Sequence, residues 1–355
     1  MTTVKRLLTL ALCAVLALSV FTACGKNATG GIDSTVTTPT ETEPTTPAPT
    51  EPAEEAKVMK ILTLGSSSSV DSNHMINLVA ATEGIGDYEE IVISTLYYSG
   101  CSLTQHVRFL SEDAAKYTLY TSSTKTPNLP PETIANVTMK DALRKDYWDI
   151  IVLQASNGET DKEESFTNGN IQIIKDYVNQ HKLNPLAEFA WHFTGVPATE
   201  MDLLNTYPNT PNNYITSMEK YGFSRPAYFA PRVANIEKFI APDPSYKFIV
   251  CSGTATMNAS SSYLTEFDVL RDYTHATDLA RVILSYTWYA NIMGIEKLDA
   301  INLDAIPKNF LRSTQNKAVD RPITDAEKDI ILESVNNALA HPYGITQSQY
   351  TVKPE

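Results

Sequence analysis

Residues 58–71 read VMKILTLGSSSSVD, and this stretch decides the fold of the chain. The apolar run from Val58 to Leu64 ends at Gly65 and predicts a buried strand of a parallel sheet. A glycine turn followed by serines at the start of a helix exposes hydroxyl and backbone N–H groups together. Ligands of such sheets bind at the carboxyl ends of the strands. We therefore expect the functional site to begin at Gly65.

Outward from this stretch, strands alternate with helices. This alternation predicts an α/β fold, a three-layer sandwich with a mostly parallel central sheet. We expect Ser72 to cap a helix that runs to about Glu83. Residues 111–146 are long for a crossover and predict an inserted hairpin or lid, and residues 199–244 are expected to be irregular. The predicted strands cover residues 58–64, 91–98, 148–153, 186–193 and 246–250. The predicted later helices cover residues 171–181, 279–293 and 324–341.

The N-terminus predicts export. Lys5 and Arg6 precede an apolar run, and small residues lead to Cys24, so residues 1–23 are expected to be a secretory signal. The arrangement resembles a lipobox, in which Cys24 receives the lipid; an uncleaved anchor or another cleavage site is the alternative. Residues 24–57 are rich in Thr, Pro and Glu and predict a disordered linker. One large domain is expected from 58 to 355, facing outside the cytoplasm, with the lipid anchor as its sole membrane contact.

Composition excludes some classes of partner. The formal charge is −13 and the chain has no cluster of Lys and Arg, so a nucleic-acid partner is not expected. Cys101 and Cys251 do not form a zinc pattern, and they remain open to a disulfide or to simple packing. We expect neither a metal nor a cofactor.

A second block suggests how a serine could be activated. A serine needs a base to act at neutral pH, and a histidine base needs a carboxylate to hold its tautomer. Asp272 lies three residues before His275, so one turn can bring its oxygen onto Nδ1 of the imidazole. As an alternative, Asp272 caps the following helix and His275 bonds to backbone.

Together these blocks resemble the SGNH (GDSL-like) hydrolase superfamily, in particular a group of bacterial exported proteins. The matching blocks are Gly65-Ser66-Ser67, Gly100-Cys101-Ser102-Leu103, Leu153-Gln154-Ala155-Ser156-Asn157 and Asp272-Tyr273-Thr274-His275. The resemblance implies Ser67 as nucleophile, His275 as general base and then acid, and Asp272 as its partner. It also implies an oxyanion hole formed by the N–H groups of Ser67 and Gly100 and by a side-chain amide.

The resemblance has two departures. Ser66 stands where the superfamily has Asp, and the third block lacks a clear Gly-x-Asn-Asp. We expect Gln154 to supply the amide donor of the oxyanion hole, with Asn157 as the second choice. Loss of such a donor costs about 10²–10³ in rate.

Three other residues are candidates for contacts with the substrate. Asp71 and His106 are expected near the site, and Trp191 is a candidate for stacking on a sugar ring. Cys101 is a rival nucleophile, although nothing near it in sequence lowers its pKa.

The resemblance and the compartment imply hydrolysis of small, acetyl-type esters, with acylated carbohydrate or another small ester as substrate. A carbohydrate-binding protein without catalysis and an acyltransferase with the same triad remain alternatives.

Overall fold

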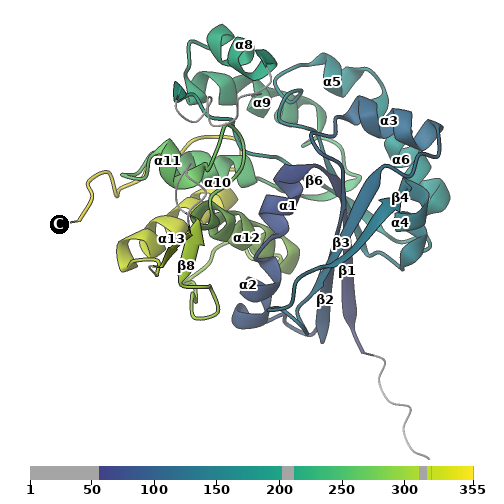
Figure 1. Cartoon of the computed structure of the whole chain (residues 1–355), viewed down its shortest axis with the longest axis horizontal. Coiled ribbons are helices and arrows are strands. Elements are labelled where there is room, and N and C mark those ends of the chain that lie inside the picture. The colour runs from purple at the N-terminus through teal and green to yellow at the C-terminus, as the bar shows by residue number, and fades with distance from the viewer. Residues whose placement is uncertain (1–55, 202–211, 312–317, 321, 355) are drawn as a thin grey trace, which may run out of the picture. The chain divides into compact units, whose positions relative to one another are not determined.

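The central feature of the structure, a computed structural model, is a seven-stranded sheet (Figure 1). The structure describes residues 56–201, 212–311, 318–320 and 322–354. The expected signal at 1–23, Cys24 and the linker up to residue 55 lie outside these residues. The strand order is β4-β3-β2-β1-β5-β6-β7, with a separate β8-β9 pair. The strands are β1 Val58–Gly65, β2 Glu90–Tyr97, β3 Tyr117–Ser123, β4 Glu132–Val137, β5 Ile150–Gln154, β6 Glu188–His192, β7 Tyr246–Val250, β8 Asn309–Leu311 and β9 Ala318–Asp320.

Five neighbouring strands are parallel and two are antiparallel. β2, β1, β5, β6 and β7 pair in parallel, and β3 and β4 add an antiparallel hairpin at the edge. β5 is buried along its whole length, as expected for a strand covered on both faces. The α/β prediction with a mostly parallel sheet is confirmed, and the insertion at 111–146 is a hairpin that extends the sheet.

Helices cover both faces of the sheet. α1, α2, α10, α12 and α13 contact one another on one side, and α3, α4, α5 and α6 contact one another on the other (Figure 1). The helices are α1 Ser67–Asn73, α2 Ile76–Glu83, α3 Leu103–Ser111, α4 Met139–Lys145, α5 Glu164–Thr167, α6 Asn170–His181, α8 Asn212–Lys220, α9 Arg225–Phe239, α10 Ser252–Ala259, α11 Glu266–Val269, α12 Asp278–Met293 and α13 Asp325–Ala340. Within the described ranges, no helix is long and apolar enough to cross a bilayer.

Two expectations about helices are wrong. The helix expected from Ser72 to about Glu83 is α2, which begins later, at Ile76, and has no side-chain cap; Ser72 lies inside α1, a short helix that is capped by Ser66. Ser66 can cap because its oxygen accepts a hydrogen bond from the N–H of Ser68. The segment expected to be irregular contains α8 and α9, and Pro226 lies in the first turn of α9, where its missing N–H removes no helical bond.

The tight turn after β1 depends on Gly65. A Cβ atom at this position would lie 2.8 Å from Oε1 of Gln154 and would also collide with the side chain of Ser69. The missing side chain therefore lets α1 begin directly against the end of β5. This close approach brings the serine run to the carboxyl edge of the sheet.

Candidate functional site

A cleft at the carboxyl edge of the sheet brings the sequence blocks together. Its lining includes Ser67, Ser68, Gly100, Asn157 and His275. The cavity has a volume of about 540 Å³. These residues come from the ends of β1, β2 and β5 and from the loop before α12, because parallel strands deliver their carboxyl ends to one edge. We call this cavity the cleft.

The histidine of the cleft is held by a buried carboxylate. Oδ2 of Asp272 lies 2.8 Å from Nδ1 of His275, and Oδ1 accepts the backbone N–H groups of Thr274 and His275 at 2.9 and 2.8 Å. The side chain of Asp272 is 1% exposed and that of His275 is 22% exposed. Burial alone would raise the pKa of Asp272, but its hydrogen bonds with His275 and the backbone lower it below its usual value. Nε2 of His275 is thus the nitrogen left to take a proton.

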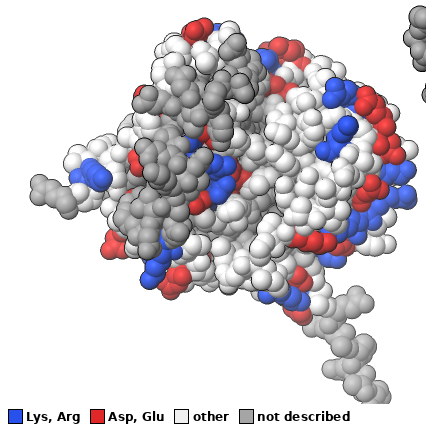
Figure 2. Space-filling model, viewed as in Figure 1, with Lys and Arg blue, Asp and Glu red and all other residues white. Residues whose placement is uncertain are grey.

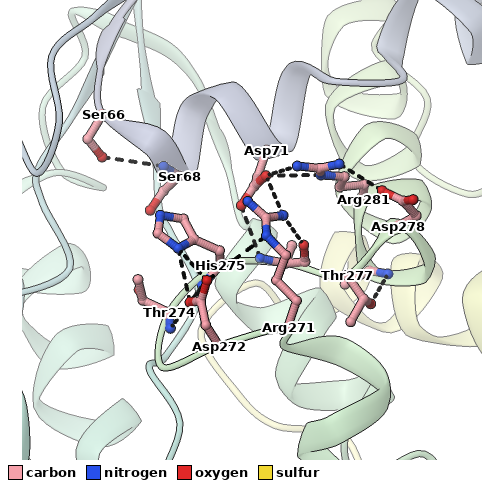
Figure 3. Close-up of polar contacts among 12 residues, drawn as sticks. Ser66, Ser68, Asp71, Arg271, Asp272, Thr274, His275, Thr277, Asp278 and Arg281 are labelled. Carbon is pink, nitrogen blue, oxygen red and sulfur yellow. Dashed lines mark hydrogen bonds and ion pairs between the residues drawn. The ribbon is translucent and has the colours of Figure 1, made fainter. Parts of the chain in front are cut away.

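Ser67 and Ser68 line the same cleft as this histidine. Ser67 lines the cleft and is partly exposed, and within the described residues its hydroxyl makes no hydrogen bond. The hydroxyl of Ser68 accepts a hydrogen bond from Nδ2 of Asn157 at 3.2 Å. Figure 3 shows the Ser68 side chain pointing toward the imidazole ring of His275. The cleft therefore offers two hydroxyl groups to one base.

Unpaired N–H groups accompany these serines. Ser67 is the first residue of α1, and the first N–H groups of a helix have no partner within the helix. Gly100 has a positive φ of 60°, which glycine adopts without strain. Neither N–H donates to another group in the part of the chain that the structure describes. Both are free to bind an anionic oxygen.

The side-chain amide of the cleft comes from Asn157. Its Nδ2 donates to Ser68 and, at 2.8 Å, to Thr274. Its Oδ1 accepts from the hydroxyl of Thr194 at 2.5 Å and from Nη2 of the fully buried Arg232 at 3.2 Å. These two donors fix the amide so that its nitrogen points toward the serines.

Gln154 does not supply the expected amide donor. Its Oε1 accepts the N–H and hydroxyl of Ser66 and the hydroxyl of Ser69, at 2.8 to 3.0 Å. Its nitrogen donates to the carbonyl oxygen of Ala155, and the side chain is 1% exposed. Gln154 is thus a buried brace between β5 and α1, because it is the last residue of β5, whereas Asn157 lies in the loop that lines the cleft.

Asp71 is likewise not available to a substrate. It lies 3% exposed on α1, and Oδ1 accepts from Arg271 and Arg281 while Oδ2 accepts the N–H of Ala276. Figure 3 shows the carboxylate between the two guanidinium groups.

Positive and negative atoms lie side by side near α1 and α12 on the face drawn in Figure 2, and both signs are interspersed around its rim.

The other two expected substrate contacts lie in the core. His106 is 1% exposed on α3 and bonds to the hydroxyl of Tyr117 at 2.8 Å. Trp191 is 0% exposed on β6. Both expectations are wrong because these side chains point into the layer between sheet and helices.

The aromatic rings that do line the cleft are Tyr214 and Tyr273. Their centroids are 4.9 Å apart, and the ring of Tyr273 lies 6.0 Å from that of His275. Tyr273 could have been found from its place between Asp272 and His275. Tyr214 carries no signal in the sequence, because α8 reaches the cleft only through tertiary packing.

Glu159 is a further residue that the sequence did not reveal. Its Oε1 accepts the N–H of Leu103 at 2.8 Å and the N–H of Ser156 at 2.9 Å. One carboxylate oxygen thus ties the loop of Gly100 to the loop of Asn157. Burial raises the pKa of Glu159, and the two backbone hydrogen bonds oppose that effect.

The cysteines take no part in the cleft. Cys101 and Cys251 are free and buried, so they are not joined in a disulfide. Burial raises the pKa of both thiols, that of Cys251 to about 12, which keeps them protonated and unreactive. Among the described residues, no group of His, Cys, Asp and Glu is arranged to hold a metal ion.

The chain matches DUF4886, a domain of unknown function, over residues 60–302. The comparison with curated proteins gives no match.

Two solved structures are similar. The crystal structure of a DUF4886 family protein from Bacteroides uniformis ATCC 8492 has a TM-score of 0.63 and 20% identity, over 82% of this chain and 98% of that one. At this identity it supports the fold alone. A protein named "putative SGNH hydrolase" from Slackia heliotrinireducens has a TM-score of 0.38 and 12% identity, over 68% and 98% of the two chains. That likeness is too weak to support an argument.

Proposed function

The chain belongs to the DUF4886 family, and from this premise we propose that it is a serine esterase that forms an acyl-serine intermediate. One observation carries the proposal. The buried Asp272 holds His275 at 2.8 Å in the same cleft as two serines and two unpaired backbone N–H groups. A base, an orienting carboxylate, a hydroxyl and N–H donors around one space are the parts that acyl transfer needs.

The reaction follows from these parts. The hydroxyl oxygen of Ser67 attacks the ester carbonyl carbon while Nε2 of His275 takes the hydroxyl proton. The N–H groups of Ser67 and Gly100 stabilise the negative oxygen that forms, and Nδ2 of Asn157 joins them by exchanging its longer hydrogen bond, to Ser68, for one to that oxygen. The carbon–oxygen bond to the alcohol then breaks, and the alcohol leaves with the proton from His275. Water repeats the sequence, so that the acid is released and Ser67 regains its proton.

Ser67 is our nucleophile for two reasons. It is the serine of the Gly-x-Ser block, and its hydroxyl has no hydrogen-bond partner among the described residues, whereas that of Ser68 accepts a hydrogen bond from Asn157. The position of Ser68 beside the ring of His275 makes it the rival (Figure 3). A bond between nucleophile and base that is absent at rest can form when substrate binds.

We further propose an acylated carbohydrate as the substrate, with a small acetyl-type acyl group. Tyr214 and Tyr273 support this, because aromatic rings at a polar cleft can pack on the apolar face of a sugar. In this proposal the protein is exported and held at the cell membrane by a lipid on Cys24, so that the cleft meets extracellular glycans.

The test is labelling of the full chain with a fluorophosphonate, followed by peptide mapping. We expect an adduct on Ser67 that disappears in Ser67→Ala and in His275→Ala but persists in Ser68→Ala. An adduct on Ser68 would move the nucleophile by one residue and keep the esterase. The absence of any adduct in a folded sample would overturn the esterase and favour a sugar-binding protein.

Hydrolase and acyltransferase are separated by product analysis. With an acceptor sugar present, a hydrolase releases free acid in proportion to the ester consumed. Transfer of the acyl group to the sugar instead of water would identify an acyltransferase with the same catalytic residues.

A further inference from the structure

A second, smaller cavity lies beside the cleft. It has a volume of about 30 Å³ and shares Ser68, Asn157 and Thr274 with the lining of the cleft. Its apolar walls come from four separate parts of the chain: Val196, Val269, Leu270, Ala276 and Leu284. We call this cavity the side pocket.

We propose that the side pocket receives the acyl group of the substrate and limits its length. This inference rests on the proposed function. In the tetrahedral intermediate, the alkyl group and the negative oxygen are attached to the same carbon. If Nδ2 of Asn157 binds that oxygen, the first alkyl carbon lies two bonds from the oxygen and therefore close to Asn157. The apolar space that Asn157 lines is the side pocket.

Most polar groups around the side pocket already have partners; Nε of Arg225 has none among the described residues and lies 4.0 Å from Oε1 of Glu266. The hydroxyl of Thr194 donates to Asn157, and that of Thr256 donates to the carbonyl oxygens of Ser252 and Gly253. The guanidinium of Arg225 donates to Ser260 and to the carbonyl oxygen of Val196. An apolar group can therefore occupy the pocket without leaving these donors unpaired, which is the main penalty of such burial.

The volume of the side pocket limits the length of the acyl chain that it can hold. About 30 Å³ holds only one or two groups of the size of a water molecule. An acetyl methyl group fits this space, and a butyryl chain does not. Val269 and Leu284 are 1% and 5% exposed, so a longer chain would have to displace packed core side chains.

The experiment compares p-nitrophenyl acetate, butyrate, hexanoate and octanoate with the full chain. We expect kcat/KM to fall about tenfold or more from acetate to butyrate, since added methylenes that do not fit a pocket have effects of this size. Leu284→Ala should raise kcat/KM for butyrate relative to acetate by about tenfold. Val269→Ala, from another wall, should shift the ratio in the same direction.

The matched control is Leu279→Ala. Leu279 lies on the same helix, α12, and is 0% exposed, but it does not line the side pocket. It should lower stability as Leu284→Ala does and leave the chain-length ratio unchanged.

Two results would contradict the role of the side pocket as the acyl-group site without contradicting the esterase proposal. One is a wild-type protein that hydrolyses octanoate as efficiently as acetate; the other is an equal shift of the ratio in Leu279→Ala and Leu284→Ala. Failure of the esterase itself looks different, because then no ester is hydrolysed and no serine is labelled.

Discussion

Oδ1 of Asp71 lies 2.6 Å from Nη2 of Arg281, although 210 residues separate the two in sequence. The pair joins α1 to α12, and Oδ2 of the same carboxylate accepts the N–H of Ala276, directly after His275. One buried carboxylate thus connects the helix of the serines with the loop of the candidate base.

We predict that Asp71→Ala lowers the free energy of unfolding by about 3 kcal/mol, because the largely buried guanidinium groups of Arg271 and Arg281 lose the carboxylate that they share and keep only their bonds to Ala276 and Asp278. Urea unfolding measures this loss. The control is Glu163→Gln, which breaks an ion pair with Lys238 whose side chains are more than half exposed and should change stability by no more than about 0.5 kcal/mol. Equal small effects of the two substitutions would contradict a central role for Asp71.

Asn157 and Gln154 should respond in opposite ways to substitution. Asn157→Asp keeps the Oδ1 acceptor for Arg232 and Thr194 but replaces the amide donor with an oxygen. We expect kcat to fall about 10²–10³-fold with the fold preserved. Gln154→Ala should mainly lower stability, by about 1–3 kcal/mol, because it leaves the buried N–H of Ser66 without an acceptor. Esterase assays and urea unfolding of both variants test this; a rate loss in Gln154→Ala without a stability loss would reverse the assignment.

Gly65→Ala should disturb both stability and labelling by fluorophosphonate. The added Cβ would collide with Ser69 and approach Oε1 of Gln154 to 2.8 Å, and overpacking of this kind costs about 1–3 kcal/mol. Gly158→Ala is the matched control in the same cleft, because its Cβ would meet nothing within 4 Å. Thermal unfolding and labelling of the two variants should separate them clearly. If they behave alike, the close approach at Gly65 does not matter.

Two buried histidines should make stability fall in mild acid. Burial lowers the pKa of His106 to about 4 and that of His192 to about 3, whereas an unfolded histidine has a pKa near 6.5. Below pH 6.5 the unfolded state therefore binds protons that the folded state does not, and stability decreases as the pH falls toward 4. The expected slope is about 1.4 kcal/mol per pH unit for each histidine.

The histidine prediction is checked by urea unfolding between pH 7 and 5. His192→Asn should reduce the slope by about half, and so should His106→Asn. The exposed His341 provides the control, because His341→Asn removes a histidine that is not in the core. An unchanged slope in both core variants would show that other groups control the acid response.

Strand positions could be predicted because each parallel strand is a short, nearly continuous apolar run. β1, β2, β5, β6 and β7 all lie within two residues of their expected bounds. The start of α2 could not be predicted, because Ser72 is a competent cap by residue type but lies inside α1. Its hydroxyl contacts Nε2 of His192 at 3.2 Å, a partner that only tertiary packing supplies.

The sequence by itself determined the layer architecture and the pairing of Asp272 with His275, since both depend on local spacing. Only the tertiary structure decided which polar side chains face the cleft. Four side chains are buried outside the lining of the cleft: Asp71, His106, Gln154 and Trp191. Three others reach the cleft or brace it: Asn157, Tyr214 and Glu159. The physical reason is that a polar side chain near a strand end can serve equally well as a buried brace or as a donor in a cavity. Which role it takes depends on partners that only the folded chain brings near, such as Ser66 for Gln154 and Ser68 for Asn157.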